Sequence, residues 1–287
     1  LVLTAILANG HVLIEGVPGV AKTLLARLTA RLIDADFSRV QFTPDLMPSD
    51  VLGTTVFNMK TNGFDFHQGP IFADIVLVDE INRAPAKTQA ALFEVMEERQ
   101  ISIDGTTHRM GDLYTILATQ NPVEQEGTYK LPEAQLDRFL MKITMDYPSL
   151  EEEVNILERH HTNAALVKLD DIVPAITKEE LLSLRAFMNQ VFVDRTLLQY
   201  IALIVQQTRT SKAVYLGASP RASVAMLQSS KAYALLQGRD FVTPEDIKFV
   251  APYVLQHRLI LTAEAEMEGY SPVKVTQRLI DKVEVPK

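Results

Sequence analysis

The residues from Gly16 to Thr23 read GVPGVAKT and differ at one position from the phosphate-binding pattern G-x-x-x-x-G-K-[ST]. Ala21 occupies the place of the last glycine. The stretch follows an apolar run and opens a helical pattern, a context in which backbone N–H groups and a helix N-terminus bind polyphosphate. Lys22 would reach the β- and γ-phosphates, and the Thr23 hydroxyl would bind Mg²⁺. The alternative is a glycine-containing turn whose lysine extends into solvent.

The sequence predicts that the whole loop takes part in nucleotide binding, mainly through its backbone. Its residues are Gly16, Val17, Pro18, Gly19, Val20, Ala21, Lys22 and Thr23. Pro18 has no N–H to donate, so it shapes the turn. Only a demand for positive φ excludes alanine, and we therefore expect a negative φ at Ala21 and a positive φ at Gly19.

Two carboxylates follow a strongly apolar run in IVLVDE (75–80). Ligands of open α/β sheets bind at the carboxyl ends of the strands, where this run ends. Asp79 would hold Mg²⁺ through water, and Glu80 would orient and deprotonate an attacking water. The alternative is a pair of solvated carboxylates that cap the next helix.

Asn121 ends the next apolar run along the chain, in ATQN (118–121). From the end of a neighbouring strand, its amide could reach the same water and the γ-phosphate. Asparagine before proline is also a routine turn former. The residues alone leave both interpretations open.

Two arginines in helical patterns are further candidates. In SPRA (219–222), Ser219 as N-cap and Pro220 at the first helical position put Arg221 in the first turn, where the helix dipole disfavours a cation. A nearby anion would remove this conflict, and either a nucleotide phosphate or an acidic side chain would serve. In LPEAQLDRF (131–139), a helix that starts at Pro132 brings Arg138 to its end, where a purely structural role is equally open.

The elements that must position these residues alternate in the first half of the chain. Strands are predicted at 11–16, 38–43, 74–81, 114–121 and 139–147, with helices at 22–33 and 85–99 between them. This rhythm predicts an α/β fold with a parallel sheet covered on both faces. Two hairpins are expected to project from it, at 54–66 around Asn62-Gly63 and at 100–110 around Asp104-Gly105.

The second half of the chain reads as helical. Segments 149–161, 177–191, 195–210, 219–237 and 243–258 carry helical spacing. Ser149 with Glu152 and Thr177 with Glu180 fit capping boxes. Pro148 marks the expected boundary between a core domain at 1–147 and an all-α lid domain at 148–287.

Composition excludes several classes of protein. The 287 residues contain no cysteine, so disulfides, thiolate metal sites and cysteine nucleophiles are absent. A net charge of −8 argues against binding nucleic acid through a general basic surface. The sequence has no apolar run long enough for a membrane span and no signal-peptide pattern, so we expect a cytoplasmic protein. It opens like the tail of a helix, and we expect further residues upstream.

Taken in order, GVPGVAKT, VDEINRAP (78–85), ATQNPVEQEGTY (118–129), LPEAQLDRF and GASPRA (217–222) resemble the MoxR family of AAA+ ATPases along nearly the whole chain. The resemblance implies ATP and Mg²⁺ as ligands, and alanine before the lysine is common in this family. It assigns Lys22 and Thr23 to Walker A, Asp79 and Glu80 to Walker B, Asn121 to sensor 1, Arg221 to sensor 2, and Arg138 to an arginine finger. Such a finger acts on a neighbouring subunit's nucleotide, which implies a ring, expected to be a hexamer. Sensor 2 could act within its own subunit or on the adjacent one.

The resemblance also implies a function, namely ATP-driven, chaperone-like assembly or activation of client protein complexes. The expected partners are clients and a separate protein with a von Willebrand factor A domain. A Val-Gly-Gln element that the family places beside the adenine does not occur in this sequence, so base specificity is only implied. Three alternatives remain: the motor subunit of a metal chelatase, a slowly hydrolysing nucleotide-gated scaffold, and a DNA motor, which the weakly basic hairpins disfavour.

Overall fold

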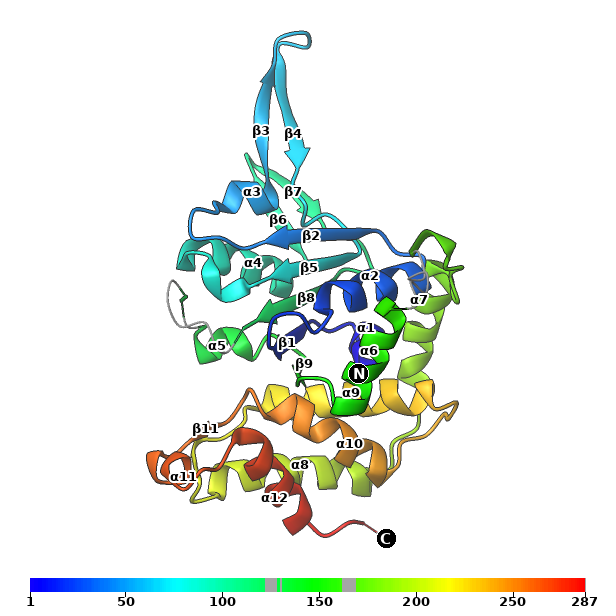
Figure 1. Cartoon of the computed structure of the whole chain (residues 1–287), viewed down its shortest axis with the longest axis vertical. Helices are drawn as coiled ribbons and strands as arrows, with labels where there is room; N and C mark the ends of the chain where they lie inside the picture. Colours follow the sequence, from blue (N-terminus) through cyan, green and yellow to red (C-terminus); the bar gives the residue numbers. More distant parts are fainter. Residues whose placement is uncertain (122–127, 130, 162–168, 287) are drawn as a thin grey trace. The chain divides into compact units, whose positions relative to one another are not determined.

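The computed structural model describes residues 1–121, 128–129, 131–161 and 169–286 (Figure 1). Its main sheet has five strands in the order β2-β5-β8-β1-β9. The strands are β1 (Val12–Gly16), β2 (Phe37–Gln41), β5 (Ile75–Asp79), β8 (Thr115–Gln120) and β9 (Met141–Met145). The five predicted strands are confirmed, and only β2 begins earlier than its predicted range, by one residue.

The sheet order explains why the candidate residues can act together. β5 pairs in parallel with β2 on one side and with β8 on the other, and β1 follows β8. The carboxyl ends of parallel strands lie at one edge of a sheet. The loop after β1, the carboxylates at the end of β5 and Asn121 after β8 therefore share that edge.

Helices α2 (Lys22–Leu32) and α4 (Ala86–Glu98) follow β1 and β5, as the helical spacing predicted. The inner strand β5 is fully apolar from Ile75 to Val78, and these four side chains are completely buried. Burial on both faces is what a parallel sheet covered by helices requires. The predicted α/β core is confirmed.

Both predicted hairpins are present, and their turns differ. β6 (Gln100–Ile103) and β7 (Thr106–Arg109) are joined by Asp104-Gly105, which has positive φ at both residues, as a type I′ turn requires. In the longer hairpin, β3 (Gly53–Asn58) pairs with β4 (Gly63–Gln68), and Gly63 already belongs to the strand. That hairpin extends away from the main sheet (Figure 1).

The C-terminal part is helical, as predicted. Its helices are α6 (Leu150–His161), α7 (Lys178–Phe187), α8 (Arg195–Thr210), α9 (Pro220–Leu236), α10 (Pro244–Leu255), α11 (Ala263–Met267) and α12 (Pro272–Lys282). Both predicted capping boxes form: the N–H of Ser149 donates to Glu152 (2.7 Å) and that of Thr177 to Glu180 (2.9 Å). The sequence reading did not include the short antiparallel pair of β10 (Val214–Leu216) and β11 (Ile260–Leu261). No described helix is long and apolar enough to cross a membrane.

The chain divides into two compact units. The sheet unit comprises Leu13–Lys130 and Thr144–Leu181, and the helical unit comprises Leu1–Val12, Leu131–Ile143 and Leu182–Lys287. In the helical unit, α1 (Val2–Leu7) packs against α9, and the Arg185 guanidinium donates to the Ile6 carbonyl (2.6 Å). The domain boundary at Pro148 stays a prediction.

We expect the start of α10 to depend on one buried carboxylate. Asp246 accepts the N–H of Thr243 (2.8 Å) and pairs with both terminal nitrogens of Arg239 (2.7 and 2.6 Å). Asp246→Ala removes the cap and leaves the guanidinium unpaired, which should lower the free energy of unfolding by about 2 kcal/mol. Urea denaturation measures this loss. The exposed neighbour Asp240→Ala serves as the control, and an equal loss in both variants would contradict this role of Asp246.

Candidate active site

The loop GVPGVAKT joins β1 to α2 and begins at a crowded position. A Cβ on Gly16 would lie 2.6 Å from the carbonyl oxygen of Met145, in the last residue of β9. Real Cβ atoms do not approach a backbone oxygen this closely. Glycine is therefore required at this position because the adjacent strand leaves no room for a side chain.

The conformation of the loop corrects one prediction and confirms another. Gly19 has a φ of +87°, as expected, and a Cβ there would meet nothing within 4 Å, so its backbone angle is the reason for glycine. Ala21 has a φ of +55°, so the predicted negative φ is wrong. Ala21 is the N-cap of α2, and its carbonyl accepts the N–H of Leu25 (3.0 Å). The left-handed turn into the helix explains the glycine of the general pattern, and alanine adopts it here at a cost of about 1 to 2 kcal/mol.

The ammonium group of Lys22 lies at the loop. Its Nζ donates a hydrogen bond to the carbonyl of Gly16 (2.7 Å), so the side chain folds back to the first residue of the loop. Thr23 follows in the first turn of α2 and is half-buried. The structure thus places the lysine and the hydroxyl at the N-terminus of the helix, where anions are favoured.

Asp79 ends β5 and is held from both neighbouring strands. The hydroxyl of Thr119, on β8, donates to Oδ1 of Asp79 (2.5 Å). Arg39, on β2, donates to Oδ2 through Nη2 (2.7 Å) and Nε (3.2 Å). These contacts fix the orientation of the carboxylate, and the Asp79 side chain is 13% exposed.

Glu80 adopts an uncommon backbone conformation, with a φ of +56°. Its N–H donates to the Thr119 hydroxyl (2.9 Å), and its Oε2 accepts from Gln41 Nε2 (2.8 Å) and pairs with Arg83 Nε (2.9 Å). A left-handed glutamate costs about 1 to 3 kcal/mol, and such outliers concentrate at functional sites. Its three partners hold the turn and the carboxylate in this strained arrangement.

Sequence reasoning missed Thr119, Arg39 and Gln41. A signal for two of them existed: Arg39 and Gln41 are two residues apart in a predicted strand, so their side chains share one face. Asn121 directly follows β8 and is buried. Residues 122–127 of the stretch ATQNPVEQEGTY lie outside the described part of the chain.

The two candidate arginines belong to the helical unit. Arg138 follows α5 (Glu133–Leu136), which starts one residue after the predicted Pro132, and it is half-buried. Arg221 is exposed in the first turn of α9, after Ser219 and Pro220, as predicted. The Ser219 hydroxyl does not cap the helix but donates to Oδ2 of Asp137 (3.1 Å).

Asp137 connects the segments that carry these two arginines. Its Oδ1 accepts from Nε of Arg258 (2.6 Å), and the same guanidinium donates to the carbonyls of Asp137 (3.1 Å), Phe139 (2.7 Å) and Leu140 (3.1 Å). Arg258 is only 4% exposed, and burial lowers its pKa despite the Asp137 carboxylate. The neighbouring His257 is also buried, which lowers its pKa well below the ordinary value. No local pattern in the sequence pointed to Arg258.

Comparison with known proteins gives this arrangement a family. Residues 11–141 match the model of the ATPase family associated with various cellular activities (AAA), and residues 206–281 match the AAA lid domain. The chain is 44% identical to the chaperone MoxR1 of Mycobacterium tuberculosis, over 99% of this chain and 77% of that protein. The chain belongs to the MoxR family of AAA+ ATPases.

Other relatives agree with this membership. The uncharacterized protein YeaC of Bacillus subtilis is 48% identical over 99% of this chain and 88% of its own length. MoxR of Methylorubrum extorquens is 30% identical over 93% of this chain and 83% of its own length. A solved structure of an ATPase candidate from Cytophaga hutchinsonii superposes with a TM-score of 0.90, at 42% identity, over all of this chain and 88% of that one. This MoxR-family chain is therefore an ATPase with an α/β core and a helical lid.

The Thr119 hydroxyl should matter for turnover and not only for stability. Thr119→Val removes the donor to Asp79 and the acceptor of the Glu80 N–H, and we expect a lower kcat together with a loss of about 1 to 3 kcal/mol in unfolding free energy. Thr115→Val is the matched control on β8, because its equally buried hydroxyl donates to the Leu113 carbonyl (3.2 Å) instead. Steady-state ATPase assays and urea denaturation separate the two effects. Equal kcat values in the two variants would contradict the assignment.

Proposed function

We propose that this chain hydrolyses Mg-ATP at the carboxyl edge of its sheet and acts as a chaperone-like remodeller of client protein complexes. The observation that carries the proposal is the contact of Thr119 with both Asp79 and Glu80: its hydroxyl donates to the Asp79 carboxylate and accepts the Glu80 N–H. Thr119 lies on β8, the strand between β5 and β1, which leads into the loop GVPGVAKT. A positioned base, a phosphate cradle and a cation ligand are the parts that phosphoryl transfer to water requires.

The loop would bind the polyphosphate. Backbone N–H groups of Gly19 to Thr23 and the N-terminus of α2 would contact phosphate oxygens, and Lys22 would exchange its contact with the Gly16 carbonyl for the β- and γ-phosphates. The Thr23 hydroxyl and the Asp79 carboxylate are oxygen donors of the kind that Mg²⁺ prefers, so the residues present fit this cation. When bound, Mg²⁺ supplies neutralisation of the phosphate charge.

Glu80 would act as the base. It would orient a water for attack on the γ-phosphorus and accept the proton that this water loses, and the bond from phosphorus to the bridging oxygen of ADP would break. Gln41 and Arg83 hold the carboxylate at Oε2 (2.8 and 2.9 Å), which limits the positions it can take. Asn121 would hold the same water from the end of β8.

The arginines would make ATP hydrolysis depend on contact between subunits. Arg138 would act as the finger on a neighbouring subunit's γ-phosphate and Arg221 as sensor 2, within a ring that we propose to be hexameric. Because Ser219 and Arg258 both contact Asp137, a shift of the segment that carries Arg138 would be felt at the start of α9. Clients and a protein with a von Willebrand factor A domain would be the partners, and a relative named chaperone MoxR1 supports this role.

Phosphate release across a range of protein concentrations tests the proposal. Turnover per subunit should rise with concentration as the ring assembles, and Glu80→Gln should abolish turnover while ATP binding persists. Arg138→Ala should bind ATP without turnover, and mixing it with Glu80→Gln should restore part of the activity, because each variant supplies the group the other lacks. The absence of rescue in a confirmed mixed ring would contradict the role of Arg138. Tight ATP binding without release in any protein would favour a nucleotide-gated scaffold.

A further inference from the structure

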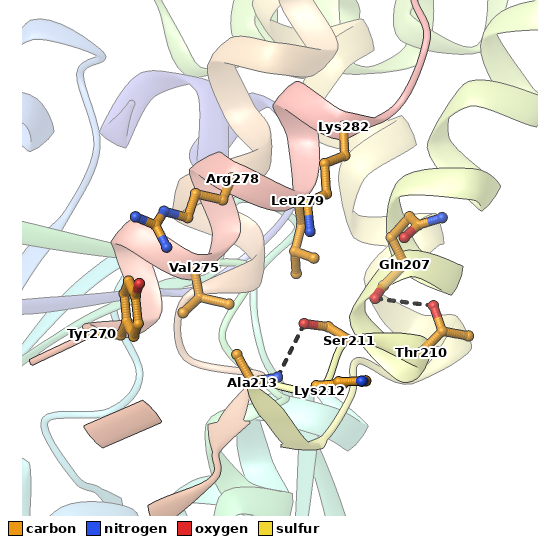
Figure 2. Close-up of a pocket in the computed structure, with 10 residues that line it drawn as sticks. All are labelled: Gln207, Thr210, Ser211, Lys212, Ala213, Tyr270, Val275, Arg278, Leu279 and Lys282. Carbon is orange, nitrogen blue, oxygen red and sulfur yellow. Dashed lines mark hydrogen bonds between the residues drawn. The ribbon is translucent and has the colours of Figure 1, made fainter. Parts of the chain in front are cut away.

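The helical unit contains a pocket of about 470 Å³ between the end of α8 and α12 (Figure 2). Its apolar wall consists of Ala213, Val275 and Leu279. Val275 and Leu279 are successive inward positions of α12, so the pocket opens over the core of this unit. None of the residues that line it belongs to the loop GVPGVAKT or to the pair Asp79 and Glu80.

The charge of the pocket contrasts with that of the whole chain. Lys212, Arg278 and Lys282 line it and no carboxylate does, although the chain has 36 acidic against 28 basic residues. The Arg278 guanidinium lies over the Tyr270 ring (4.4 Å to its centroid), which fixes that cation at one side (Figure 2). No ion pair joins any of the three cations to another described residue. A partner with negative charge and an apolar side would complement this surface.

Helix α6 of the sheet unit has this chemistry. Leu150, Val154 and Leu157 recur at the spacing i, i+4, i+7 and are 80, 45 and 68% exposed, which is an uncovered apolar stripe. At 100° per residue, Glu153 falls on one side of the stripe and Glu151 on the other. α6 is thus an exposed amphipathic helix with carboxylates on both flanks of its apolar side.

We propose that α6 of a second copy of this chain docks in the pocket formed by Lys212, Arg278 and Lys282. The apolar stripe would face Val275 and Leu279, and the flanking glutamates would pair with the cations on the two sides. The pocket and the helix are different surfaces, so each copy would use both, and such head-to-tail contacts form a ring when the rotation between successive copies closes. The inference rests on the ring proposed above and names one contact that builds it.

The lack of natural cysteines permits a direct cross-linking test. Lys282→Cys protein mixed with Val154→Cys protein should form a covalent dimer under mild oxidation with Mg-ATP present, whereas neither variant should do so alone. Gln277→Cys replaces Lys282→Cys in the control, because Gln277 is exposed on α12 but does not line the pocket. Equal cross-linking in the control pair would overturn the proposal.

Analytical ultracentrifugation of the same samples distinguishes failure of the proposed contact from failure of ring formation. Rings that assemble without cross-linking would overturn the contact and leave the ring intact. Cross-linked dimers that never progress to larger species would support the contact and contradict the closed ring. If neither rings nor cross-links form, the result contradicts both the contact and the ring.

Charge reversal provides a second arm. Lys212→Glu with Lys282→Glu should raise the protein concentration at half-assembly by about tenfold or more, with a weaker effect at high salt. Glu151→Lys with Glu153→Lys in the same chain should restore assembly, since the charges are then exchanged across the contact. Failure of the exchange to restore it would contradict the proposal. If rings form without the cross-link and a glutamate-rich peptide binds to the pocket, the pocket serves another acidic partner. That result would overturn the proposal.

Discussion

The site depends on one hydroxyl group between two strands. Thr119 on β8 donates to the Asp79 carboxylate and accepts the N–H of Glu80, so a single side chain fixes one carboxylate and the backbone of the next residue at the end of β5. The bond is possible because β5 and β8 are adjacent and parallel, and because Glu80 turns into a left-handed conformation directly after the strand. The strain of that turn costs about 1 to 3 kcal/mol. The contacts of Glu80 with Thr119, Gln41 and Arg83 offset this cost and also orient the proposed base.

A second polar cluster organises the helical unit in the same manner. The buried guanidinium of Arg258 donates to the Asp137 carboxylate and to the backbone carbonyls of Asp137, Phe139 and Leu140, while Ser219 contacts the other carboxylate oxygen of Asp137. A buried charge of this kind persists only when it is paired and fully hydrogen-bonded. It joins the segment that carries Arg138 to the start of α9, where Arg221 lies.

The sequence predicted the elements well, because apolar runs and helical spacing are local properties. The strands and the parallel arrangement follow from them, as do the helix starts at Ser149, Thr177 and Pro220. The predicted sign of φ at Ala21 was wrong, because a loop's dihedral angles depend on the path of the chain from strand to helix and not on residue type alone. The partners Arg39, Gln41 and Arg258 lie 40, 39 and 121 positions from the residues they contact. The spacing of Arg39 and Gln41 indicates that they share one strand face, but no local pattern identifies the distant residue that each partner contacts.

The central claim is that GVPGVAKT binds nucleotide phosphate although alanine occupies its left-handed position. Calorimetric titration of ATP with Mg²⁺ into the native protein, Lys22→Ala and the exposed hairpin control Lys60→Ala tests it most directly. The account predicts binding by the native protein and by Lys60→Ala, and its loss in Lys22→Ala, because that variant lacks the ammonium that reaches the β- and γ-phosphates. Full affinity in Lys22→Ala would show that the loop is not the phosphate site.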